Sequence, residues 1–190
     1  SSFATSGADC GGFGTGLVGS FTRDAGQYCT KPGLVFAPSG EGVDDAVAGA
    51  LGSAPASRQL TEGMSAAYAE ALELFGADDD ATVLLGRDEP GSSVPAVVLT
   101  DAAAFLAESE RYTQERFGPV TVVVSYRDDE LPAVLDALRP SLAATIHRGA
   151  GEDVTALSAA LAPIAGRLLF DGWPTGVAIG WAQHHGGSWP

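Results

Sequence analysis

Apolar segments that can form β-strands alternate along the chain with segments that can form amphipathic helices, and this alternation constrains the fold most. Residues 119–126 (PVTVVVSY) are a continuous apolar run, and residues 128–139 follow with leucine and valine at helical spacing. The same order recurs in residues 141–148, 152–165 and 166–170. Strands that are apolar on both faces and separated by helices indicate a mainly parallel sheet with helices on both faces. The sequence therefore predicts an α/β fold.

Further elements complete this pattern toward the N-terminus. We expect strands at residues 33–38, 81–86 and 95–100, and helices at residues 14–26, 39–51 and 60–76. The Gly-rich stretch at residues 11–16 is a weak match to a dinucleotide-binding loop, because no strand is predicted before it. Residues 171–190 lose the periodicity and are rich in Gly, Trp and His, which is typical of an irregular functional segment.

The charge balance limits the classes of partner. The 190 residues carry a net charge of −14, and both nucleic acid and an anionic membrane would repel such a chain. No apolar run approaches the roughly 20 residues that span a bilayer. Two cysteines in a chain of this length do not make a disulfide framework, which agrees with a reducing compartment. We therefore expect a cytoplasmic protein without a nucleic acid or membrane partner.

Cys29 is the first candidate for chemistry. It lies in the stretch DAGQYCTKPG (24–33), between a predicted helix and a predicted strand. A nucleophilic cysteine reacts as its thiolate. The preceding helix would present the negative end of its dipole to Cys29, so the thiol would need a separate general base. The alternative is a buried cysteine that fills apolar space, and Lys31 is expected to be a surface charge.

A second candidate lies in the stretch TQERFGPV (113–120). Glu115 and Phe117 precede a Gly-Pro turn that leads into an apolar strand. A carboxylate and an aromatic ring at the entrance of a strand suit a ribose hydroxyl and a flat heterocycle. The alternative is a solvated charge beside an aromatic residue of the core.

Histidines raise two other possibilities. Adjacent His184 and His185 rarely ligate one ion together, and no CxxC or HxxxH spacing accompanies them, so we expect no metal site with Cys10 or Cys29. A cysteine hydrolase would use Cys29 as the nucleophile and His184 or His185 as the base. A non-enzymatic acidic interaction module, in which Cys29 is inert, is a third alternative. His147 ends an apolar strand and is expected to be structural.

Three stretches together resemble the aldehyde dehydrogenase superfamily. AGQYCT (25–30) resembles the motif around that family's catalytic cysteine, and ERFGP (115–119) resembles its E-x-F-G-P motif. FDGWPTGV (170–177) and HHGGSWP (184–190) are similar to the NADP-type fatty-aldehyde and α-ketoglutaric-semialdehyde (2,5-dioxovalerate) dehydrogenases. The resemblance covers nearly all of the chain and implies the fold of the family's catalytic domain.

The resemblance assigns roles to individual residues. It implies that Cys29 is the nucleophile, that Glu115 holds the nicotinamide ribose of NADP or NAD, and that Phe117 packs near the nicotinamide. In the family's chemistry the cysteine attacks an aldehyde or semialdehyde to give a thiohemiacetal, hydride passes to the cofactor, and the thioester that results is hydrolysed to a carboxylic acid. Gln27 matches a motif position without a firm role, and Asp171 stands where the subgroup usually has Asn.

The resemblance also implies that residues 1–190 are a catalytic-domain fragment of a longer enzyme. In the family the general base, an oxyanion-binding Asn and the cofactor-binding domain precede the cysteine-bearing segment, and an oligomerisation strand follows it. We therefore expect the isolated fragment to be inactive and the full-length enzyme to be a homo-oligomer that acts on a small-molecule aldehyde. Trp173 and Trp181 are expected either to line the substrate pocket or to belong to the core.

Overall fold

The computed structural model describes residues 1–175 and Trp181. Seven strands form one sheet in the order β3-β4-β5-β2-β1-β6-β7. The strands are β1 (Ser2–Ala4), β2 (Leu34–Pro38), β3 (Thr82–Leu85), β4 (Ala96–Asp101), β5 (Val120–Tyr126), β6 (Ala144–His147) and β7 (Leu168–Phe170). Neighbouring strands are parallel except β3 and β4, which form an antiparallel pair. The predicted mainly parallel sheet is therefore confirmed.

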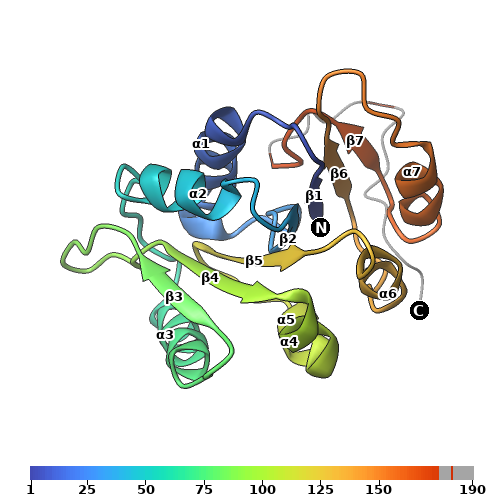
Figure 1. Cartoon of the computed structure of the whole chain (residues 1–190). Helices are drawn as coiled ribbons and strands as arrows, with labels where there is room; N and C mark the ends of the chain where they lie inside the picture. The colour runs from blue at the N-terminus through green and yellow to red at the C-terminus, as the bar shows by residue number, and fades with distance from the viewer. Residues whose placement is uncertain (176–180, 182–190) are drawn as a thin grey trace.

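Helices cover both faces of this sheet (Figure 1). One face carries α1 (Cys10–Phe21) and α2 (Val43–Leu51). The other face carries α3 (Glu62–Gly76), α4 (Ala102–Ala107), α5 (Ser109–Thr113), α6 (Leu131–Asp136) and α7 (Thr155–Leu161). Within the described residues, no helix has both the length and the apolar character that crossing a membrane requires.

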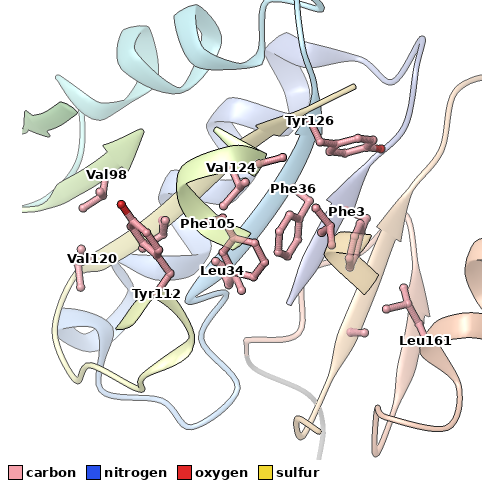
Figure 2. Close-up of a cluster of buried hydrophobic side chains, with 14 of the residues drawn as sticks. Phe3, Leu34, Phe36, Val98, Phe105, Tyr112, Val120, Val124, Tyr126 and Leu161 are labelled. Atoms are coloured by element: carbon pink, nitrogen blue, oxygen red, sulfur yellow. The ribbon is translucent and has the colours of Figure 1, made fainter. Parts of the chain in front are cut away.

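Successive strand residues point alternately into two separate cores. Phe3 and Phe36 stack in one core with ring centroids 4.8 Å apart, and Phe105 of α4 meets Phe36 edge-on at 5.2 Å (Figure 2). Val35 and Val123 point the other way, into the core beneath α1 and α2. Because both faces of the central strands are buried, their residues are apolar without interruption, which is the pattern from which the strands were predicted.

The prediction for residues 14–26 is wrong at both ends. α1 begins at Cys10 and ends at Phe21, and a separate 3-10 turn, η1, covers Arg23–Gly26. The Gly-rich stretch therefore lies inside a helix, and a strand, β1, does precede it. Its glycines allow close packing, since a Cβ atom on Gly14 would lie 2.7 Å from the backbone of Ala46 and one on Gly16 would lie 2.2 Å from the Trp173 indole nitrogen.

Two short helices of the second face were not predicted from the sequence. α4 and α5 follow β4 directly, and Asp101 caps α4 by accepting a hydrogen bond from the Ala104 N–H at 2.9 Å. An aspartate at this position, followed by an alanine-rich run, is a recognisable helix start. α5 ends at Thr113 and leads directly into the segment that contains Glu115.

Candidate active site

A cavity of about 550 Å³ lies at the amino ends of the parallel strands. Its walls come from residues within segments 28–34, 112–122 and 138–142, which precede or begin β2, β5 and β6, together with Ser1 and Phe75. Cys29, Glu115 and Phe117 all line this one cavity. The structure thus brings together the two candidate stretches of the sequence, which lie more than eighty residues apart.

Cys29 is exposed on a tight turn between η1 and β2. The backbone reverses sharply before it, with positive φ angles of 48° at Asp24, 57° at Ala25 and 67° at Gly26. The Tyr28 hydroxyl donates a 2.6 Å hydrogen bond to the Asp24 carboxylate, which braces the turn. The alternative of a buried, space-filling Cys29 is therefore wrong.

Glu115 and Phe117 line the same cavity from the connection between α5 and β5. Glu115 is exposed, and 43% of Phe117 is exposed, so the alternative of a core aromatic residue at this position is wrong. Arg116 lines the cavity as well, and its guanidinium lies 4.5 Å from the centroid of the Phe75 ring and donates to the carbonyl of Arg111 at 2.9 Å. These contacts anchor Arg116 in the wall between Glu115 and Phe117.

Lys31 is not the surface charge that we predicted. Its ammonium donates three hydrogen bonds to backbone carbonyls, those of Arg116 at 2.9 Å, Gly118 at 3.1 Å and Val120 at 2.7 Å. Burial lowers the pKa of Lys31 to about 7, and the negative charge of Glu115 acts in the opposite direction. The sequence carries no signal for this contact, because the acceptors are main-chain atoms 85 to 89 residues away.

Two glycines let the cysteine-bearing turn touch the opposite segment. The Gly118 N–H donates to the Gly26 carbonyl at 3.2 Å. A Cβ atom on Gly26 would lie 2.0 Å from the Gly118 carbonyl oxygen, and a Cβ atom on Gly118 would lie 2.2 Å from the Tyr68 ring. Both residues have positive φ, 67° and 136°, which favours glycine at each position.

A second cavity, of about 720 Å³, lies beside the first. It is lined by residues of α3 and by residues 114–117, so Glu115 and Phe117 stand on the ridge between the two cavities. Gln27, which had no firm role, accepts a hydrogen bond from the Leu60 N–H at 2.9 Å and so connects the cysteine turn to the segment before α3.

The histidines divide between described and undescribed parts of the chain. His184 and His185, which the cysteine hydrolase alternative requires, lie outside the described residues. In residues 1–175 and Trp181, no group of three or more His, Cys, Asp or Glu side chains is placed to hold a metal ion. His147 packs against Trp173 at 4.2 Å and Phe13 at 4.9 Å between ring centroids, and burial lowers its pKa to about 4. The prediction that His147 is structural is thus confirmed.

The remaining candidates lie away from the first cavity. Trp173 packs against Phe13 beneath α1 and belongs to the core, whereas Trp181 is exposed. Asp171 accepts hydrogen bonds from the backbone N–H and the Nε of Arg148, both at 2.9 Å. At this position the resembling subgroup usually has Asn, and here the carboxylate pairs with Arg148.

Sequence comparison identifies related proteins. No family model matches the chain. An α-ketoglutaric semialdehyde dehydrogenase 2 from Azospirillum brasilense is 38% identical over 192 residues, an alignment that includes 93% of this chain and 35% of the relative. The chain therefore spans about a third of the length of this relative.

Solved structures share the fold over nearly the whole chain. A variant of proline utilization A (PutA) from Bradyrhizobium japonicum superposes with a TM-score of 0.80 at 21% identity, over 100% of this chain and 21% of that one. A 1-pyrroline-5-carboxylate dehydrogenase from Thermus, solved with bound NAD, gives a TM-score of 0.78 at 19% identity, over 98% and 38%. By its 38% identity to this semialdehyde dehydrogenase and by the fold that it shares with these structures, the chain is similar to proteins of the aldehyde dehydrogenase superfamily.

Proposed function

We propose that this chain is the cysteine-bearing catalytic domain of an NAD(P)-dependent aldehyde dehydrogenase, which oxidises an aldehyde or semialdehyde to a carboxylic acid. The observation that carries the proposal is one cavity lined by an exposed cysteine, a carboxylate and a half-exposed aromatic ring. The semialdehyde dehydrogenase relative supports the substrate class, and the NAD-bound structural neighbour supports the cofactor class.

The residues of the ridge fit a nicotinamide nucleotide. Phe117 offers an exposed ring face, and Glu115 offers a carboxylate within two residues of it, which suits a flat heterocycle joined to a ribose. A carboxylate accepts hydrogen bonds and is the group that best pairs with ribose hydroxyls. When bound there, the cofactor would supply the hydride acceptor of the reaction.

Cys29 carries the covalent chemistry in this proposal. Its thiolate adds to the aldehyde carbon, the carbonyl electron pair moves to oxygen, and a thiohemiacetal forms. In this proposal the backbone N–H of Cys29 would stabilise that oxyanion. Loss of a hydride from the same carbon restores the carbonyl as a thioester, and attack by water releases the carboxylic acid and regenerates the thiol.

Other parts of the full-length protein would complete this site. The chain aligns with only 35% of the semialdehyde dehydrogenase relative, so the rest of such a protein can supply the cofactor-binding domain, the general base and a side-chain oxyanion donor. We accordingly expect the 190 residues alone to be inactive, the full-length enzyme to be a homo-oligomer, and its location to be cytoplasmic, where cysteines without disulfides persist.

The full-length protein tests the proposal directly. It would be assayed with α-ketoglutaric semialdehyde and with a long-chain aldehyde, each with NAD and with NADP. We expect cofactor reduction that requires aldehyde, together with a thioester adduct on Cys29 in mass spectra of protein quenched during turnover. A folded protein that oxidises neither aldehyde with either cofactor would refute the proposal, and cofactor-independent thioester or amide hydrolysis would favour the cysteine hydrolase alternative.

A further inference from the structure

The Lys31 side chain crosses from the turn that carries Cys29 to the segment that carries Glu115 and Phe117. We call residues 26–31 the cysteine turn and residues 114–120 the ridge segment. The three acceptors of the ammonium, the carbonyls of Arg116, Gly118 and Val120, belong to alternate residues of the ridge segment. In an extended chain the first and last of these carbonyls would lie about 13 Å apart. The ridge segment is instead bent, with a φ of 136° at Gly118, so one ammonium reaches all three carbonyls. All three of its protons are thereby used.

The position of these acceptors fixes both functional walls. Phe117 lies between the first two accepting residues, and Glu115 directly precedes the first. Lys31 itself follows Cys29 by two residues, and its backbone N–H donates to the Tyr28 carbonyl at 3.0 Å within the cysteine turn. Together with the hydrogen bond from the Gly118 N–H to the Gly26 carbonyl, this side chain therefore sets the separation between the backbone that carries the thiol and the backbone that carries the ring.

Other hydrogen bonds already join the strands on either side of Lys31. Beyond the cavity, β2 and β5 are joined by their ladder, and the chain just before β2 is held by two further bonds. The Thr121 hydroxyl donates to the Pro32 carbonyl at 2.8 Å, and the Val122 N–H donates to the Gly33 carbonyl at 3.1 Å. An apolar residue of similar volume would avoid the desolvation penalty of the ammonium but would leave the three carbonyls without this donor.

We propose that Lys31 is a positioning residue, which ties the cysteine turn to the ridge segment and so holds the Cys29 thiol at the reacting distance from substrate and cofactor. This inference rests on the proposed function. A misplacement of the reacting groups by about 1 Å can lower a rate by roughly 10²-fold, and loss of the three hydrogen bonds of Lys31 would allow displacements of that size.

The test compares three variants of the full-length enzyme. Lys31→Met removes all three donors at similar volume, and Lys31→Arg keeps a charge and several donors. Arg127→Met is the matched control, because Arg127 lines neither cavity and pairs with exposed Asp129 at 3.2 Å. We expect Lys31→Met to lower kcat by about 10- to 100-fold. Lys31→Arg should recover part of that loss, and Arg127→Met should stay within about twofold of the unmodified enzyme.

Two readouts separate positioning from folding. The first is how much bound cofactor slows the alkylation of Cys29 by iodoacetamide, and the second is the melting temperature. A purely structural lysine predicts a lower melting temperature with unchanged kcat per folded molecule, and that result would overturn the inference. If Lys31→Met does not fold, Lys31→Gln, which keeps two donors, takes its place. Its kcat per folded molecule, its cofactor protection of Cys29 and its melting temperature then test the inference in the same way.

The outcomes also separate this inference from the proposed function. An active unmodified enzyme whose folded Lys31→Met variant keeps kcat and cofactor protection within twofold would overturn the role of Lys31 alone. An unmodified full-length protein that neither oxidises aldehydes nor forms an adduct on Cys29 would overturn the proposed function, whatever the variants do.

Discussion

Cys10 and Cys29 lie at opposite ends of the parallel strands of one sheet. Cys10 begins α1, just after the carboxyl end of β1. General rules favour that place, because ligands in open α/β sheets usually bind at the carboxyl ends of strands and a helix N-terminus stabilises a thiolate. Yet the Cys10 sulfur donates to the Glu41 carbonyl at 3.0 Å and lines neither of the two cavities described above.

Connections pack closely at both edges of the sheet. At the carboxyl edge, a Cβ atom on Gly149 would lie 2.4 Å from the Ser6 carbonyl oxygen. The Gly149 N–H donates to the Thr5 hydroxyl at 3.2 Å, and that hydroxyl also bonds the Glu152 carboxylate. At the amino edge, the cysteine turn and the ridge segment touch at Gly26 and Gly118, and the connections before β2, β5 and β6 line a cavity beside that contact. The exposed thiol therefore meets the other candidate functional groups at the amino edge of the sheet.

The largest expected effect separates the two cysteines. Cys29→Ser in the full-length enzyme should lower kcat for aldehyde oxidation by at least about 10³-fold, because a hydroxyl is a far weaker nucleophile than a thiolate. Cys10→Ser should change kcat by less than about twofold. Steady-state kinetics on both variants measures this contrast. Equal losses of kcat would mean that both edges of the sheet contribute to catalysis.

The second prediction concerns the backbone contact that closes the amino edge. Gly26→Ala should destabilise the protein by about 3 kcal/mol or more, since its Cβ would lie 2.0 Å from the Gly118 carbonyl oxygen at a φ of 67°. Gly151→Ala is the matched control, because Gly151 also has a positive φ, 76°, but has open space around its Cβ position. We expect about 1 kcal/mol for that change.

Urea unfolding of each purified alanine variant measures both free energies. Similar losses at the two glycines would show that backbone conformation, and not the contact between the cysteine turn and the ridge segment, sets the cost. That result would weaken the view that this contact holds the cysteine turn and the ridge segment at a fixed distance from each other.

Sequence reasoning succeeded where the signal was local and failed where it depended on distant main-chain atoms. The apolar runs predicted the sheet, and short motifs selected Cys29, Glu115 and Phe117, which the structure places on one cavity. Lys31 was misjudged because three carbonyls accept its protons, and carbonyls look alike in every sequence. β1 was missed because three residues are too few to establish a period.

The third prediction uses the titration of Lys31. With its pKa lowered to about 7, the amine loses its third proton as pH rises, and one of the three carbonyls then lacks a donor. We expect the Kd of the cofactor to rise by up to about tenfold between pH 6 and pH 9, because a lost buried hydrogen bond is worth about 1 kcal/mol. Glu115 and Arg116 are the charged groups that act on the amine.

The free energy of unfolding should rise with pH, whereas the affinity for the cofactor should fall. Between about pH 7 and the unfolded lysine pKa near 10.4, the unfolded chain binds more protons than the folded one, so the free energy of unfolding contributed by Lys31 rises with pH. Equilibrium binding and urea unfolding of the unmodified protein and of Lys31→Met measure both trends. A cofactor Kd that depends on pH equally in both proteins would assign the dependence to another group.

The smallest expected effect lies at the carboxyl edge, where Asp171 pairs with Arg148. Asp171 has a φ of 54°, a conformation that asparagine also tolerates well, and an asparagine oxygen can still accept from the Arg148 N–H. Asp171→Asn therefore removes only the charge of an exposed pair, and we expect the melting temperature to fall by no more than about 3 °C.

The effect of Asp171→Asn should depend on pH. Hydrogen bonds from Arg148 lower the pKa of Asp171, so the stabilisation by its carboxylate is present above the unfolded pKa near 3.9 and is lost as pH falls through the folded pKa. Melting curves at pH 7 and pH 3 should show the difference between the two proteins shrinking in acid. A larger or pH-independent difference would mean that the carboxyl edge depends on this carboxylate for more than an ion pair, and that the contrast between the two edges is less sharp than the two cysteines suggest.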